Sequence, residues 1–100
     1  MDLEQKQRDE ARWRILRVLD AGRPISVSET IIWRVLHDIR LPMSINSVRR
    51  ELFYLRDLGL IVVEGDDTEI WLARLTARGV DVVEYTIEAP VGIARPRKYW

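Results

Sequence analysis

From Ser26 to Ile61 the chain reads SVSETIIWRVLHDIRLPMSINSVRRELFYLRDLGLI, and this segment carries the strongest signals of the fold. Apolar residues recur within it at helical spacing twice, first at positions 32, 35, 36 and 39 and then at positions 45, 48, 52, 55 and 58. Pro42 ends the first of these helices, Ser44 caps the second, and Gly59 terminates it. Because only a short turn separates the two helices, the stretch predicts a helix-turn-helix unit.

The residues on either side of this unit predict further elements. Upstream, residues 3–21 repeat apolar side chains at helical spacing and stop at Gly22, so they predict another helix. Downstream, the apolar runs 60–63 and 70–73 flank the polar, turn-rich loop 64–69. Such a pattern predicts a β-hairpin directly after the helix-turn-helix unit.

Two segments of the chain resemble a known family. Residues 44–61 resemble the recognition helix and first wing strand of winged helix-turn-helix regulators, and their ending L-x-x-L-G-L-I is common to the ArsR-, MarR- and PadR-like groups. Residues 75–85 are ambiguous between helix and strand on periodicity alone. Residues 75–84 are similar to the L-T-x-x-G-x-x-V-V-E stretch that opens the helix after the wing in those groups, so the resemblance favours a helix there.

Residues 89–100 hold two prolines and a glycine and predict an extended tail. Their last part, residues 92–100, resembles the ending of small winged-helix proteins of Mu-like prophages. Together the resemblances imply an α+β, mainly helical fold: a winged helix-turn-helix with three helices, a two-stranded wing, a short C-terminal helix and an extended tail. We expect this domain at residues 1–88 and the tail at 89–100. The chain departs from MarR- and PadR-like dimers, because few residues beyond position 85 remain to build their long terminal helix.

The composition excludes several classes of site. The 100 residues suit a single core, and the absence of cysteine excludes disulfides, thiolate zinc sites and cysteine nucleophiles. The lone histidine, His37, supplies neither the metal-sensing cluster of ArsR-like proteins nor a histidine-centred triad. We find no glycine-rich phosphate loop and no carboxylate pair in a motif, so we expect neither an enzyme nor a bound cofactor, metal or effector. The charged start, and the lack of any apolar run of about 18 residues, predict a cytoplasmic protein without a signal peptide or membrane span.

The charges of the chain balance only as an average. The sequence holds 16 basic and 16 acidic residues, and this neutrality by itself argues against a nucleic-acid partner. Residues 21–60, however, hold six basic and four acidic residues, and residues 90–100 hold three basic and no acidic ones. Residues 61–89 hold seven acidic residues against two basic ones. We therefore expect DNA phosphates to repel the hairpin tip, while the helix-turn-helix region keeps a positive charge.

The helix at about 44–58 is the main functional candidate, because the corresponding helix of such units enters the major groove of DNA. Its candidate DNA-binding residues are Ser44, Asn46, Ser47, Arg49, Arg50 and Tyr54. Asparagine can pair with an adenine edge, arginine with a guanine edge or a phosphate, and serine suits phosphate contacts. The alternative is an ordinary solvated face, on which the two arginines balance Glu29, Glu51 or Asp57.

The tail adds a second candidate contact to DNA. Arg95, Arg97 and Lys98 lie beside Tyr99 and Trp100, and this mixture of charge and aromatic rings is typical of arms that follow a groove or a backbone. The alternative is a tail that folds back over its own domain, since burial of the two rings favours that arrangement. The sequence leaves both alternatives open.

We therefore predict a small protein that binds double-stranded DNA, a transcriptional regulator of phage or prophage origin. Such domains gain specificity by pairing across two half-sites, and the helix at 3–21, with Trp13, is the expected surface of a homodimer. The alternative is a protein-interaction module that uses the winged fold without reading DNA. It would bind a host or phage protein through the acidic hairpin tip and exposed aromatic residues, with Trp13, Phe53, Asp66 and Asp67 as its candidate residues.

Overall fold

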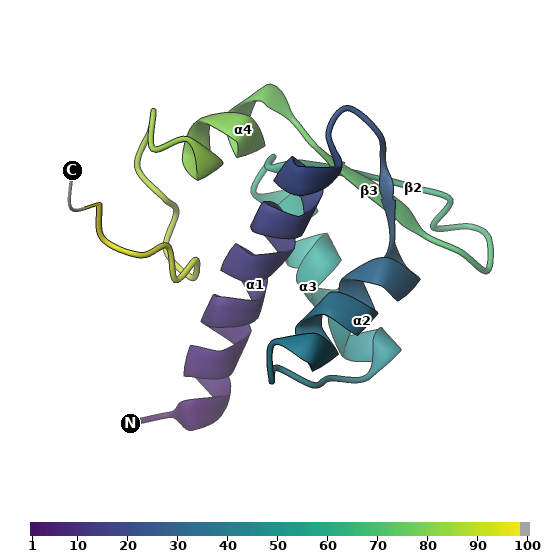
Figure 1. The fold of residues 1–100 in the computed structure, drawn as a ribbon, viewed down its shortest axis with the longest axis horizontal. Coiled ribbons are helices and arrows are strands. Elements are labelled where there is room, and N and C mark those ends of the chain that lie inside the picture. The colour runs from purple at the N-terminus through teal and green to yellow at the C-terminus, as the bar shows by residue number, and fades with distance from the viewer. Residues whose placement is uncertain (99–100) are drawn as a thin grey trace.

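The computed structural model describes residues 1–98 and has an α+β fold that is about half helical (Figure 1). Within that range, four helices and three strands follow in the order α1 (Leu3–Gly22), β1 (Val27–Ser28), α2 (Glu29–Asp38), α3 (Ile45–Asp57), β2 (Ile61–Glu64), β3 (Leu72–Leu75) and α4 (Ala77–Val83). The helices predicted at 3–21 and 44–58, and the helix favoured at 75–85, are confirmed, and their ends differ from the prediction by no more than about two residues, the usual scatter of helix boundaries.

The three strands form one antiparallel sheet in the order β1-β3-β2. β2 and β3 make the predicted hairpin, while β1, which the sequence did not indicate, pairs with the other edge of β3. The second hairpin strand begins at Leu72 rather than at position 70, because Thr68 holds the preceding residues in a loop. The Thr68 hydroxyl lies within hydrogen-bond distance of the carbonyl oxygens of Gly65 (2.6 Å) and Ile70 (3.1 Å).

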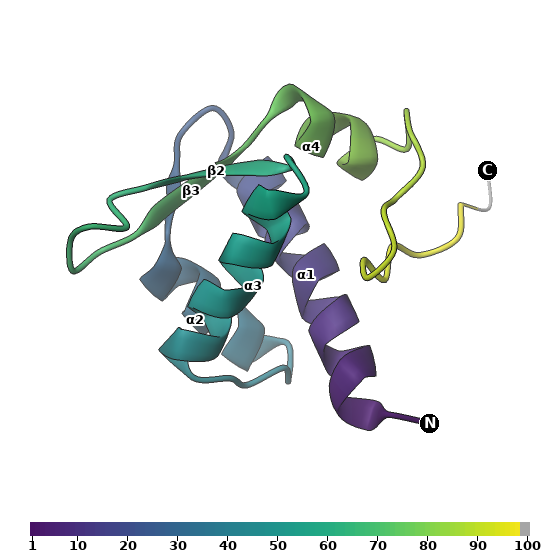
Figure 2. The same cartoon turned by 180° about the vertical axis from the view of Figure 1, so that it is seen from behind.

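The core is organised around α1, which packs against α2, α3, α4 and two strands. Figures 1 and 2, two opposite views, show α1 on one side of α3, with the sheet and α4 at the same end of both helices. The buried side chains of α1 include Ala11, Ile15, Leu16 and Leu19, which recur at helical spacing. Burial of this stripe against the other helices and the sheet stabilises the fold.

Each helix begins at a side-chain cap, as the residue preferences of helix starts predict. The side-chain oxygens of Asp2, Ser28, Ser44 and Thr76 each accept a hydrogen bond from the backbone N–H three residues later. The short connection between α2 and α3 includes Arg40 in the left-handed backbone region (φ 68°). This connection holds the start of α3 close to the end of α2.

The residues after α4 fold back over the helices (Figures 1 and 2). The N–H of Ala94 donates to the carbonyl oxygen of Asp9 in α1 (3.1 Å), and the Tyr85 hydroxyl donates to the carbonyl oxygen of Pro96 (2.7 Å). Ile93 is buried. Of the two alternatives for the tail, the folded-back arrangement holds as far as Lys98; Tyr99 and Trp100 lie outside the described residues.

Candidate nucleic-acid interface

The first turn of α3 carries three of the predicted DNA-binding side chains. The Ser44 hydroxyl caps the helix by accepting a hydrogen bond from the N–H of Ser47 (3.1 Å), and it also donates to the Ser47 hydroxyl (3.0 Å). Asn46 is exposed, and within residues 1–98 its amide makes no hydrogen bond. The start of α3 therefore presents a free amide beside two hydroxyls.

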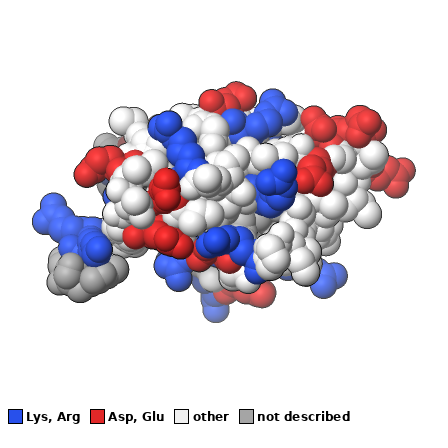
Figure 3. All heavy atoms as spheres, turned by 90° about the horizontal axis from the view of Figure 1, so that it is seen from above, with Lys and Arg blue, Asp and Glu red and all other residues white. Residues whose placement is uncertain are grey.

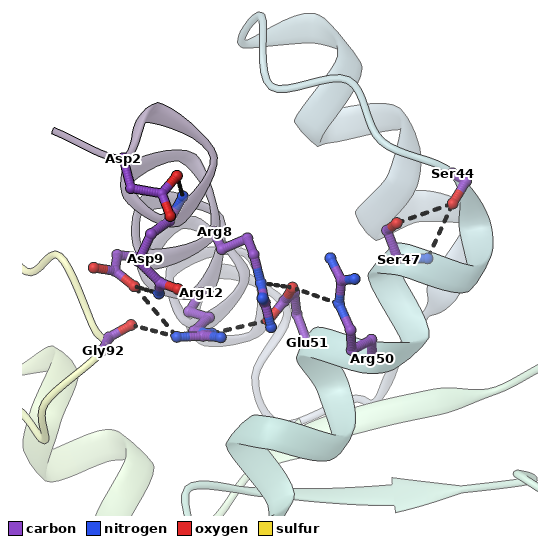
Figure 4. A network of polar contacts seen from close by, with 10 residues as sticks. Asp2, Arg8, Asp9, Arg12, Ser44, Ser47, Arg50, Glu51 and Gly92 are labelled. Atoms are coloured by element: carbon purple, nitrogen blue, oxygen red, sulfur yellow. Dashed lines mark hydrogen bonds and ion pairs between the residues drawn. The ribbon is translucent and has the colours of Figure 1, made fainter.

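One turn further along, α3 directs a charged side chain into the protein. Glu51 is fully buried, and its carboxylate accepts three charge-assisted hydrogen bonds (Figure 4). Arg12 Nε donates to Oε1 (2.9 Å), while Arg8 Nε and Arg50 Nε both donate to Oε2 (3.1 and 3.2 Å). A carboxylate removed from water is costly unless it is paired and hydrogen-bonded. The arginines therefore make the burial of Glu51 possible.

Arg12 links this cluster to the tail. Its side chain is 3% exposed, and its Nη1 donates to Asp9 (3.3 Å) and to the carbonyl oxygen of Gly92 (3.2 Å). The guanidinium lies over the Tyr54 ring, 3.6 Å from its centroid. The Tyr54 hydroxyl donates to the carbonyl oxygen of Val91 (3.1 Å). The ring and the hydroxyl of Tyr54 thus pack against Arg12 and the tail, and a contact of Tyr54 with DNA stays a prediction.

Arg49 is held by a carboxylate of its own. Its Nε and Nη2 donate to the two oxygens of Glu29 (2.7 and 2.6 Å), and Nη2 also reaches the carbonyl oxygen of Glu69 (3.3 Å). The hydrogen bonds to Glu29 raise the pKa of Arg49 above its usual value, and burial opposes this shift. The guanidinium stacks on Trp71, 4.4 Å from the ring centroid. The pairing of Arg49 with Glu29 is what the alternative of an ordinary solvated face predicts. It leaves Arg49 little freedom to contact a base.

Arg50 fits both interpretations of α3, the DNA-binding face and the solvated face with balanced charges. It balances Glu51, as the alternative proposed, but its side chain is 50% exposed. Arg8, which the sequence analysis did not select, is 30% exposed. Asn46 and Arg50 are one helical turn apart and therefore lie on the same side of α3.

The aromatic residues predicted for partner binding are packed inside the fold. Trp13 is 3% exposed and meets Tyr85 edge-on, with ring centroids 6.3 Å apart. Phe53 lies 4.9 Å from the Trp71 ring and is covered on another side by the guanidinium of Arg56 (4.2 Å). The prediction of Trp13 as the dimer surface is wrong, because α1 turns this ring into the core. Phe53 is half-buried at the junction of α3 and the hairpin, so it is not the exposed aromatic that was expected.

The basic residues of the tail differ in their roles. Arg95 Nη1 donates to two backbone carbonyl oxygens, of Val82 at 2.9 Å and of Ile87 at 2.8 Å, and the guanidinium lies over the Tyr85 ring. Arg95 therefore fastens the tail to α4, and a contact of Arg95 with DNA stays a prediction. Arg97 is exposed, and Lys98 lies with its Nζ 5.9 Å from the Tyr85 centroid.

The acidic hairpin tip is exposed, as the charge pattern predicts. Figure 3 shows acidic atoms gathered at the end of the molecule where Figure 1 places the β2–β3 loop. Glu64 pairs with Arg74 across the hairpin (3.0 Å), and Asp66 lies 3.8 Å from Arg56. Asp67 is exposed. Only part of the acidic charge at this tip is balanced by these contacts.

An exposed apolar surface lies between α1 and α2. An open groove of about 660 Å³ runs along these helices, and Ile25, Ile31 and Ile39 line it with exposed side chains. Arg14 and Arg17 stand along the α1 side of the groove. Helical spacing did not predict this surface, although Ile25 and Ile31 fall outside the apolar stripes expected in the core.

A signal for the buried ion cluster was also present in the sequence. Glu51 continues the spacing of Val48, Leu52 and Leu55, so it occupies a core-facing position of α3. Arg12 stands at the same spacing with the apolar residues 15, 16 and 19 of α1. Charged residues are almost never fully buried unless they are paired. Opposite charges within two apolar stripes thus indicate an ion pair between the helices.

Comparisons with known proteins give no relative. No protein family, no curated protein and no solved structure matches this chain. In the described part of the chain, no three histidine or acidic side chains gather as metal ligands would, and none of the helices has the length and apolar character to cross a membrane.

Proposed function

We propose that this protein is a winged helix-turn-helix protein that binds double-stranded DNA with α3 in the major groove and acts as a small transcriptional regulator. The order of the elements supports the fold: two helices joined by a short turn, a hairpin and a further helix follow one another as the resemblance implies. The phage or prophage origin rests on the resemblance of the tail.

The observation that carries this proposal is the pair Asn46 and Arg50. Asn46 is exposed with a free amide, and Arg50 is half-exposed one turn later on the same side of α3. An amide can pair with the N6 and N7 edge of adenine, and a guanidinium can pair with guanine or with phosphate. Both groups reach outward from the half of α3 that such proteins place in the groove.

The hairpin contributes little to binding in this proposal. Its tip carries exposed acidic residues, whereas affinity for DNA rises with cations that neutralise phosphates. Recognition therefore rests on α3 and its flanks. A single domain of this kind covers a short site, so two copies on neighbouring half-sites would supply the rest of the specificity.

The test of this function is selection of duplexes from a randomised library by the full chain, followed by affinity measurements on the selected sequence over a range of salt. We expect binding that weakens steeply with salt and a sequence preference that Asn46→Ala relaxes at one base pair, because that variant removes a base contact. Thr86→Ala, an exposed polar residue beyond α4, is the matched control and should change nothing. Failure to enrich any sequence, with salt-independent binding, would contradict the proposal.

A protein-interaction module is the second candidate, and the groove between α1 and α2 favours it. Exposed apolar patches of this kind mark interaction sites in soluble proteins. Ile31→Glu would place a charge in the groove. If the protein is such a module, it binds a protein partner even at a salt concentration that removes DNA binding. Ile31→Glu then abolishes the binding of that partner, and the surface of α3 plays no part in it.

A further inference from the structure

We infer that Arg8 and Arg50 form a clamp for one phosphate of the nucleic-acid backbone, oriented by the buried carboxylate of Glu51. This inference rests on the proposed function and extends the DNA contact from α3 to the N-terminal half of α1. It adds Arg8, a residue outside the predicted site, and gives Glu51 the role of a positioning residue.

The first observation is that two arginines share one carboxylate oxygen. Arg8 Nε and Arg50 Nε both donate to Glu51 Oε2, at 3.1 and 3.2 Å. One comes from α1 and the other from α3, so the shared oxygen holds the two guanidinium groups together across the junction of the helices (Figure 4). Within residues 1–98 their Nη groups donate no hydrogen bond. Four N–H groups on each guanidinium remain for a ligand.

The second observation is the charge of the cluster. Within residues 1–98, Arg8, Arg12 and Arg50 face two carboxylates, those of Glu51 and Asp9, so one positive charge of the cluster has no partner there. The carboxylate and Arg12 are buried, whereas Arg8 and Arg50 reach the surface with 30% and 50% of their side chains exposed. The uncompensated charge therefore lies where an anion can approach.

The third observation is the kind of ligand that this arrangement fits. A guanidinium offers planar pairs of N–H groups that match the oxygens of a phosphate, and its charge does not depend on pH. Two guanidinium groups fixed by one carboxylate are already ordered, so less side-chain entropy is lost on binding. With α3 in the major groove, its flank faces the phosphates that border the groove, and such contacts fix the position of the protein on the duplex.

The experiment measures binding of a short duplex by fluorescence anisotropy over a range of salt, for Arg8→Gln, Arg50→Gln and the double variant. Each single variant should weaken binding about tenfold, the size expected for one charge-assisted contact. Because both arginines hold the same phosphate, the double variant should lower the slope of log affinity against log salt by about one, not two. Arg14→Gln is the matched control: it removes an exposed arginine from the same helix outside the cluster and should leave the slope unchanged.

Other outcomes would overturn the inference in distinguishable ways. Sequence-selective binding that survives the loss of both arginines would remove the clamp and the role of Arg50, and would leave DNA recognition to Asn46 and the rest of α3. A slope lowered by two would mean separate phosphates and contradict the shared site. Inorganic phosphate that shifts the side-chain NMR signals of Arg8 and Arg50, in a protein whose affinity for the duplex ignores both substitutions, would identify a small-anion site. Unfolding curves of each variant confirm that the fold is retained.

Discussion

Arg49 and Arg50 are neighbours on α3, yet the fold uses them in opposite ways. Among the described residues, Arg49 alone pairs with the carboxylate of Glu29, with hydrogen bonds of 2.7 and 2.6 Å, and it stacks on Trp71. Arg50 shares Glu51 with two other arginines and donates one N–H at 3.2 Å. The number of arginines for each carboxylate, more than the position along the helix, decides which cation remains available to a ligand.

Removing either carboxylate should have the largest effect on the two arginines. We expect Glu51→Gln to lower the free energy of unfolding by about 3 kcal/mol, because it leaves the buried guanidinium of Arg12 without its main counter-charge. Glu29→Gln should cost less, since Arg49 is nearer the surface and can turn toward water. Urea unfolding followed by tryptophan fluorescence measures both. Equal losses would show that burial of the arginines does not distinguish the two pairs.

Substituting glutamine for each arginine in turn should separate the structural role of Arg49 from the DNA-binding role of Arg50. Arg49→Gln should lower the midpoint of unfolding while the folded protein keeps its affinity for DNA, since Arg49 joins α2, α3 and the hairpin loop. Arg50→Gln should weaken binding about tenfold and lower the midpoint less than Arg49→Gln does, because Arg8 and Arg12 still donate to the buried carboxylate of Glu51. The two measurements together are the readout, and a loss of affinity in Arg49→Gln at unchanged stability would contradict the structural role of that residue.

The helices could be predicted from the sequence because their signals are local. Apolar spacing, the cap at Ser44 and the stop at Gly59 lie within the segments that they define, and α3 begins and ends within one residue of the prediction. β1 was missed for the opposite reason. Two residues carry no periodic signal, and Val27–Ser28 is a strand only because β3 lies beside it.

The site was harder to predict, because exposure depends on residues far away in the chain. Trp13 and Tyr54 lie on helices that were placed correctly, but residues 85–92 cover them. Arg8 and Glu51 are 43 residues apart, so their contact depends on how α1 packs against α3. The charged positions within the apolar stripes indicated a buried pair, yet the sequence does not say which arginines complete it.

The smallest expected effect concerns a second comparison, between the basic flank of α3 and the acidic hairpin tip. Asp66→Asn with Asp67→Asn should raise affinity for a duplex about threefold at low salt, because it removes repulsion between exposed carboxylates and phosphates. Stability should not change, since Asp66 contributes only one long surface contact, 3.8 Å from Arg56. Glu84→Gln with Glu88→Gln is the control, as it removes the same charge from exposed residues that follow α4, outside the hairpin tip. An equal rise in both double variants would mean that net charge alone matters and that the hairpin tip does not approach the DNA.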